Sequence, residues 1–189
     1  MNAMSTRGAG AVPLSDAIAK GQAPDGGLYM PQAIPKQTGP WGDSFTDRAT
    51  TALRPFFADD ALAPHLVDIV TESFSFAAPT RWIEDDTALL ELFWGPTAAF
   101  KDFGARFLAS CLTRLFEPNS HHTVLVATSG DTGAAVAAAF HQRPGFRVVV
   151  LYPDGRVSPR QAHQLGAFGD NVAAYRVAGT FDDCPRLVK

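Results

Sequence analysis

The chain has 189 residues, of which 46% are hydrophobic and 19% charged, so it can build a packed core and is not wholly disordered. Its formal net charge of −3 and isoelectric point near 5.9 exclude the basic surface that nucleic acids and anionic membranes attract. Two cysteines, Cys111 and Cys184, form no metal-ligand pattern and suit a reducing compartment. We therefore expect a cytoplasmic protein that has no metal and neither a nucleic-acid nor a membrane partner.

Residues 1–78 are expected to form a loop-rich and helical N-terminal region. Glycine and proline are frequent over residues 8–42, which favours irregular extended chain. One short helix is predicted there over 15–20, with Ser15 as its cap. Over residues 45–76 the apolar positions recur with a helical period, so this interval is predicted to be helical.

Residues 79–189 are expected to form the first part of an α/β domain, truncated at its C-terminal end. Predicted strands and helices alternate along this part, with strands at 89–94, 123–127, 147–152 and 172–177, and helices at 98–116, 134–142, 158–165 and 180–189. Such alternation predicts a parallel sheet with helices on both faces, a three-layer arrangement. Because the chain stops inside the last predicted helix, we expect the sheet to be incomplete.

The segment Gly95–Gly104 is the first candidate for chemistry. Thr97 is expected to cap a helix that begins at Ala98, which places Lys101 in its first turns. On the helical period Lys101 shares a face with small and apolar residues. Apolar surroundings and the positive end of a helix both favour the neutral amine that forms a Schiff base. The alternative is a solvated lysine whose stem covers apolar surface.

The sequence Ala-Thr-Ser-Gly-Asp-Thr-Gly at 127–133 is the second candidate, because it joins a predicted strand to a predicted helix. Such turns bind ligands in α/β sheets, and the free amides of the helix start favour a carboxylate or phosphate. No lysine follows the last glycine, which excludes a nucleotide P-loop. The tripeptide Asp131-Thr132-Gly133 also occurs in aspartic proteases, but in an all-β setting. A plain βα turn is the structural alternative.

Together the two candidates resemble the threonine synthases, pyridoxal-phosphate-dependent enzymes of fold type II. Residues 92–107, Leu-Phe-Trp-Gly-Pro-Thr-Ala-Ala-Phe-Lys-Asp-Phe-Gly-Ala-Arg-Phe, resemble the lysine segment of that family, and residues 128–135 resemble its Gly-rich substrate loop. Further similar segments lie at 23–29, 151–153, 158–159 and 179–184. Either motif alone would indicate only the wider cofactor group, whereas the combination, in the family's order along almost the whole chain, is specific.

The resemblance implies an enzyme that converts O-phospho-L-homoserine and water into L-threonine and phosphate, by γ-elimination and β-addition of water. Pyridoxal 5′-phosphate would be the cofactor and electron sink, and Lys101 would carry it as a Schiff base and then shuttle protons. The residues implied to bind the cofactor are Lys101, Ser129, Gly130, Asp131, Thr132 and Gly133. Those implied to bind the substrate are Thr97, Ser129 and Thr132.

The family's chains are much longer, and the groups that hold the cofactor's phosphate and ring nitrogen lie in their later part. We therefore expect this chain to be inactive alone, and to form a homo-oligomer or pair with the missing C-terminal part. A threonine-synthase-like phospho-lyase, or another fold-type-II lyase such as a dehydratase, is an alternative that would share Lys101. A non-catalytic partial domain acting in assembly through its unfinished sheet edge is an alternative of another class.

Overall fold

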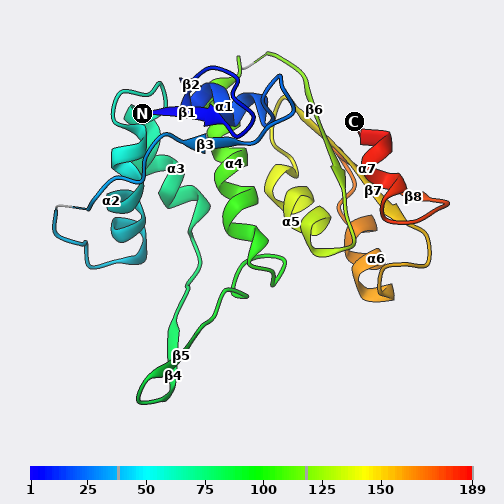
Figure 1. Ribbon diagram of the computed structural model, residues 1–189. Coiled ribbons are helices and arrows are strands. Elements are labelled where there is room, and N and C mark those ends of the chain that lie inside the picture. The colour runs from blue at the N-terminus through cyan, green and yellow to red at the C-terminus, as the bar shows by residue number, and fades with distance from the viewer. Residues whose placement is uncertain (38, 118, 189) are drawn as a thin grey trace. The chain divides into compact units, whose positions relative to one another are not determined.

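The computed structural model describes residues 1–37, 39–117 and 119–188 (Figure 1). The chain divides into two compact units, of which unit 1 comprises Met1–Ser75 with Ser110–Phe116, and unit 2 comprises Phe76–Ala109 with Glu117–Lys189. Helix α4 (Lys101–Leu115) therefore contributes its first part to unit 2 and its last part to unit 1.

Unit 1 combines a small antiparallel sheet with short helices. Its strands lie in the order β2 (Val12–Pro13), β1 (Asn2–Ser5), β3 (Tyr29–Pro31). Strands β2 and β3 fall inside the stretch predicted to be irregular, so that prediction missed two short strands. The helical prediction for residues 45–76 is confirmed. The helices that lie wholly within unit 1 are α1 (Leu14–Lys20), α2 (Phe45–Phe57), the 3₁₀ turn η1 (Ala63–His65) and α3 (Leu66–Ser73).

The prediction that Ser15 caps α1 is wrong. The helix begins one residue earlier, after Pro13, and Ser15 is buried within its first turn. The Ser15 amide donates to Asp60 Oδ2 at 2.9 Å, so a carboxylate far along the chain supplies the acceptor that a capping side chain would provide. Asp60 Oδ1 also accepts the amide of Leu62 at 3.0 Å. A tertiary contact, rather than a local one, sets the start of this helix.

The strand predicted over 89–94 is wrong in its bounds. Strands β4 (Thr80–Glu84) and β5 (Thr87–Leu90) form an antiparallel hairpin, and the chain leaves the strand conformation after Leu90. Every residue of both strands is exposed. Neither strand therefore has the alternation of buried and exposed positions by which a sequence reveals a half-buried strand.

The parallel sheet predicted for the second half of the chain is confirmed. Its strands lie in the order β6 (His122–Ala127), β7 (Phe146–Pro153), β8 (Val172–Val177). The helices that follow these strands in turn are α5 (Asp131–Phe140), α6 (Pro159–Gly166) and α7 (Asp183–Val188). Helices α5 and α6 contact each other, and α5 also contacts β6 and β7 (Figure 1).

The two faces of this sheet are covered unequally. Val148 and Val150 of β7 are fully buried on one face, whereas Leu125 on the other face keeps 47% of its surface exposed. Gly133 brings α5 close to the buried face. A Cβ at position 133 would meet Thr128 Cγ2 and would lie 2.9 Å from Val150 Cγ1. The glycine therefore lets the turn after β6 pack directly on the sheet.

Gly133→Ala tests this close approach. We expect the substitution to lower the free energy of unfolding by about 1–3 kcal/mol, because the added methyl group overpacks the contact with Val150. Gly166→Ala is the control, since Gly166 ends α6 with open space around it. Chemical denaturation of the two variants measures the difference. Equal unfolding midpoints would contradict the role given to Gly133.

Candidate active site

Lys101 is the first residue of α4, so the predicted helix start at Ala98 with a Thr97 cap is wrong. Ala98 has φ +56°, in the left-handed region that helices do not use. The Asp102 carboxylate accepts the Thr97 amide at 2.9 Å and the Thr97 hydroxyl at 2.8 Å. The hydroxyl is thus a donor here and not the acceptor that a helix cap requires.

Asp102 fixes the loop that leads into Lys101. Its side chain is fully buried, and the two hydrogen bonds from Thr97 satisfy both carboxylate oxygens. Gly95 makes room for it, because a Cβ at position 95 would lie 2.8 Å from Asp102 Cβ and 2.9 Å from its Cγ. The backbone on either side of Lys101 is therefore held from within the protein.

The Lys101 amine lies beside the Gly-rich turn, in a partly enclosed setting. Its side chain is 31% exposed, and Nζ lies 3.8 Å from Asp131 Oδ2 and 4.2 Å from the centroid of the Phe100 ring. A cavity of about 350 Å³ opens next to this amine. The residues that line the cavity are Leu92, Phe93, Ala98, Ala99, Phe100, Lys101 and Asp131. The structure thus brings the two sequence candidates together.

Thr128 holds the Gly-rich turn in place and is a residue that the sequence predictions missed. Its hydroxyl oxygen accepts the amides of Gly130 at 2.9 Å and Gly133 at 2.8 Å, and the side chain is 1% exposed. Gly130 has φ +142°, a conformation that residues with a side chain rarely adopt. A threonine placed between a strand and a glycine turn is the signal that was available, since its hydroxyl can accept nearby backbone amides.

The predicted site residues of the turn divide into two groups. Gly130 and Gly133 are buried, whereas Ser129, Asp131 and Thr132 are exposed. The buried glycines anchor the backbone to Thr128, and the exposed side chains remain accessible to a ligand. Two hydroxyl donors and the first amides of α5 can together bind a carboxylate or phosphate, beside an amine that can attack a carbonyl.

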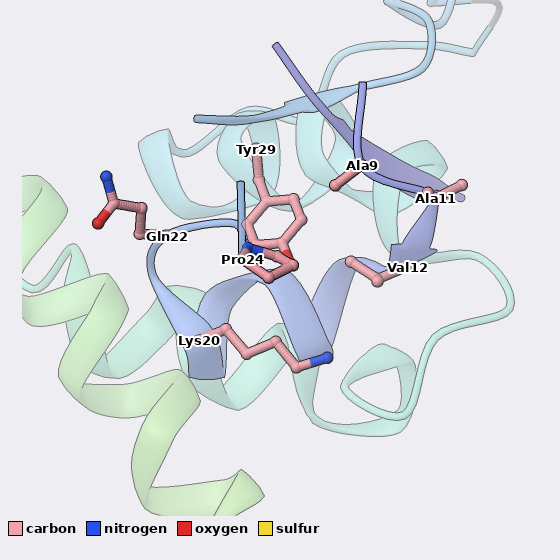
Figure 2. Close-up of a pocket in the computed structure, with 8 residues that line it drawn as sticks. Ala9, Ala11, Val12, Lys20, Gln22, Pro24 and Tyr29 are labelled. Atoms are coloured by element: carbon pink, nitrogen blue, oxygen red, sulfur yellow. The ribbon is translucent and has the colours of Figure 1, made fainter. Parts of the chain in front are cut away.

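A larger cavity of about 630 Å³ lies in unit 1 (Figure 2). Its polar side chains are Lys20, Gln22 and Tyr29, and the other residues that line it are small or apolar. Lys20 Nζ pairs with Asp16 at 3.3 Å. The sheet beside this cavity is antiparallel, whereas the smaller cavity is lined by Asp131 of the turn that follows a parallel strand, so the cavity beside Lys101 is the better candidate for chemistry.

The cysteines are poor candidates for nucleophiles. Burial raises the pKa of the Cys111 thiol to about 12, and burial also raises the pKa of Cys184, so both remain protonated at neutral pH. Within residues 1–37, 39–117 and 119–188, histidine, cysteine and acidic side chains form no group of three that could hold a metal ion. In the same ranges, every helix is too short or too polar to cross a membrane.

The parallel sheet, the Gly-rich turn at the carboxyl end of β6 and the adjacent lysine define an α/β protein that can present an amine to a ligand at the strand ends. Residues 88–189 match the family model described as pyridoxal-phosphate dependent enzyme, and residues 3–74 match the model described as threonine synthase N terminus. The chain belongs to the family of pyridoxal-phosphate-dependent enzymes.

The relatives agree with this assignment. Threonine synthase from Escherichia coli is 40% identical over 183 residues, which cover 94% of this chain and 42% of the relative. Its crystal structure matches with a TM-score of 0.89 at 37% identity, covering all of this chain and 45% of that one. The pyridoxal-phosphate-bound threonine synthase from Brucella melitensis matches with a TM-score of 0.87 at 38% identity, covering 100% and 43%. The chain thus spans less than half the length of these relatives.

Thr128→Val tests the role of the buried hydroxyl. Valine keeps the shape but leaves the amides of Gly130 and Gly133 without their acceptor, so we expect a loss of about 1–3 kcal/mol in unfolding free energy. Hydrogen exchange at these two amides should accelerate as well. Thr123→Val, on an exposed position of β6, is the matched control. Unchanged exchange at both glycines would refute the role assigned to Thr128.

Proposed function

We propose that Lys101 binds pyridoxal 5′-phosphate covalently, in an enzyme that converts O-phospho-L-homoserine and water into L-threonine and phosphate. The observation that carries the proposal is the Lys101 amine beside the Gly-rich turn, at a cavity of about 350 Å³, in a chain of this family. The cavity is open to solvent, since Phe93 and Phe100 at its wall keep 52% and 61% of their surface exposed. Leu92, Phe93 and Phe100 provide an apolar wall that suits a planar aromatic ring.

The Gly-rich turn binds the anionic groups of the cofactor and substrate in this proposal. Thr128 occupies the amides of Gly130 and Gly133, so the amides of Asp131 and Thr132 at the start of α5 are the ones assigned to a ligand. The Ser129 and Thr132 hydroxyls add neutral donors for the substrate carboxylate. These side chains are exposed, which supports the assignment.

Thr97 has a more limited role in substrate binding than the sequence suggested. Its hydroxyl already donates to Asp102 at 2.8 Å, so it can meet the substrate only as a hydrogen-bond acceptor. The substrate amine is the group that such an acceptor would serve. Thr97 thus supports the substrate end of the site while it fixes the loop before Lys101.

Lys101 would act as the proton carrier whenever its amine is free. The cofactor, when bound, supplies the electron sink for the carbanion chemistry. The Lys101 amine moves protons at Cα and Cβ of the substrate, and Asp131 Oδ2 at 3.8 Å is the carboxylate that stabilises it when it carries a proton. Two free, buried cysteines support a reducing compartment, and we place the protein in the cytoplasm.

Lys101→Ala is expected to abolish the absorbance band that forms when the chain is mixed with pyridoxal 5′-phosphate, because the amine that condenses with the aldehyde is gone. Borohydride reduction followed by peptide mass spectrometry should find the label on Lys101 in the unmodified sequence. Lys20→Ala, in the other unit, should keep the band and the label. Equal labelling of both lysines would contradict the assignment of Lys101.

Product analysis tests the reaction. The full-length protein is expected to form threonine and phosphate from O-phospho-L-homoserine, with both products lost in the Lys101→Ala variant. A 2-oxo acid formed from O-phosphothreonine in place of threonine would identify a phospho-lyase that shares the same lysine and turn. If the full-length protein forms neither product, the catalytic proposal fails.

A further inference from the structure

Gln161 of α6 contacts Asp131 of the Gly-rich turn, the same residue that lies beside Lys101. Its Nε2 donates to Asp131 Oδ1 at 2.9 Å, and the other oxygen, Asp131 Oδ2, lies 3.8 Å from Lys101 Nζ. One carboxylate thus connects an amide group from α6 with the amine at the start of α4. The carboxylate itself stands on the first residue of α5.

The cap of α6 decides which end of the Gln161 amide faces Asp131. Gln161 Oε1 accepts the Ser158 hydroxyl at 2.8 Å and the Ser158 amide at 3.2 Å, and the Ser158 oxygen in turn accepts the Gln161 amide. This is a capping box, in which a glutamine three residues after a serine satisfies the helix start. Because the oxygen is committed to Ser158, the nitrogen is the end left to donate to Asp131.

Gly130 gives the Gln161 side chain its space. A Cβ at position 130 would overlap the Gln161 amide nitrogen and would lie 2.6 Å from its Cδ. The glycine therefore serves two needs at once, the φ of +142° and the approach of Gln161 to the turn. Such a close approach ties the position of α6 to that of the Gly-rich turn.

We propose that Gln161 is a positioning residue for Lys101: it holds one oxygen of the Asp131 carboxylate so that the other oxygen stays beside the amine. Lys101 and Asp131 keep 31% and 55% of their side-chain surface exposed, and an exposed pair gains little when both side chains are free to move. A carboxylate already fixed by Gln161 loses less conformational entropy when it pairs. Gln161 thereby sets how firmly the amine is held beside the Gly-rich turn. The inference rests on the proposed function only in giving Lys101 an aldehyde to react with.

The reactivity of the Lys101 amine provides the test, without any cofactor. The chain is treated with a limiting amount of an acylating reagent at mildly alkaline pH, and mass spectrometry compares labelling of Lys101 with that of Lys20 as internal reference. Asp131→Asn should raise Lys101 labelling about two- to fivefold, because the Lys101 side chain loses the carboxylate contact that holds it. Gln161→Met should give most of the same rise, and the double variant should add little more.

Ser158→Ala is the matched control. It loses the Ser158 hydroxyl of the capping box, and with it a similar amount of helix stability. It keeps the backbone amide of residue 158, which still donates to Gln161 Oε1, so Gln161 Nε2 still faces Asp131. We expect its Lys101 labelling to equal that of the unmodified sequence. If Gln161→Met leaves labelling unchanged, or Ser158→Ala raises it equally, Gln161 is only a helix cap and the proposal is wrong.

Measuring cofactor binding distinguishes a failure of this inference from a failure of the function on which it rests. If the labelling pattern holds but no absorbance band forms with pyridoxal 5′-phosphate in the full-length protein, the proposed function fails and the positioning role stands. If the band forms on Lys101 and the labelling pattern is absent, the positioning role alone is overturned. Where both hold, Gln161→Met should also shift the pyridoxal 5′-phosphate concentration at half-saturation, whereas Ser158→Ala should not.

Discussion

Two buried backbone amides and one hydroxyl govern the shape of this site. The amides of Gly130 and Gly133 both donate to the Thr128 hydroxyl oxygen. A buried amide without an acceptor costs about 1–3 kcal/mol, so the turn cannot open at one glycine without a penalty. The position of Asp131, which lies between these glycines, follows from that constraint.

A turn closed by a single hydrogen-bond acceptor also occurs in two other segments that resemble the family. In residues 23–29, Asp25 accepts the Ser5 hydroxyl and the amide of Gly27, and these hydrogen bonds lower its pKa. Near the C-terminus, Asp183 accepts the amide and hydroxyl of Thr180, and the amide lowers the pKa of Asp183 most. In each case one acceptor closes one turn. The short motifs therefore mark backbone geometry.

Local signals predicted the parallel sheet well, and non-local contacts caused the errors. The strand predicted over 172–177 coincides with β8, because an apolar run between turn residues depends only on its own sequence. The caps assigned to Ser15 and Thr97 were wrong, since the acceptors turned out to be the carboxylates of Asp60 and Asp102. A propensity for capping identifies a residue that can accept a hydrogen bond, but it does not identify the competing acceptor that the fold brings close. The cavity beside Lys101 could be predicted from the sequence, because two recognisable motifs meet there. The role of Gln161 could be inferred only from the way α6 packs in the structure.

Three helix starts meet at the Asp131 carboxylate, and each is fixed by its own set of hydrogen bonds. Asp102 with Thr97 fixes the start of α4, Thr128 fixes the start of α5, and Ser158 with Gln161 fixes the start of α6. Helix starts carry unsatisfied amides and a positive end, which makes them suited to anionic ligands but leaves them prone to fray. A site built from three such ends needs a rigid frame, since a shift at any one of them would move the amine or the carboxylate. Capping interactions local to each helix, with one carboxylate shared among them, supply that frame without a large buried core around the site.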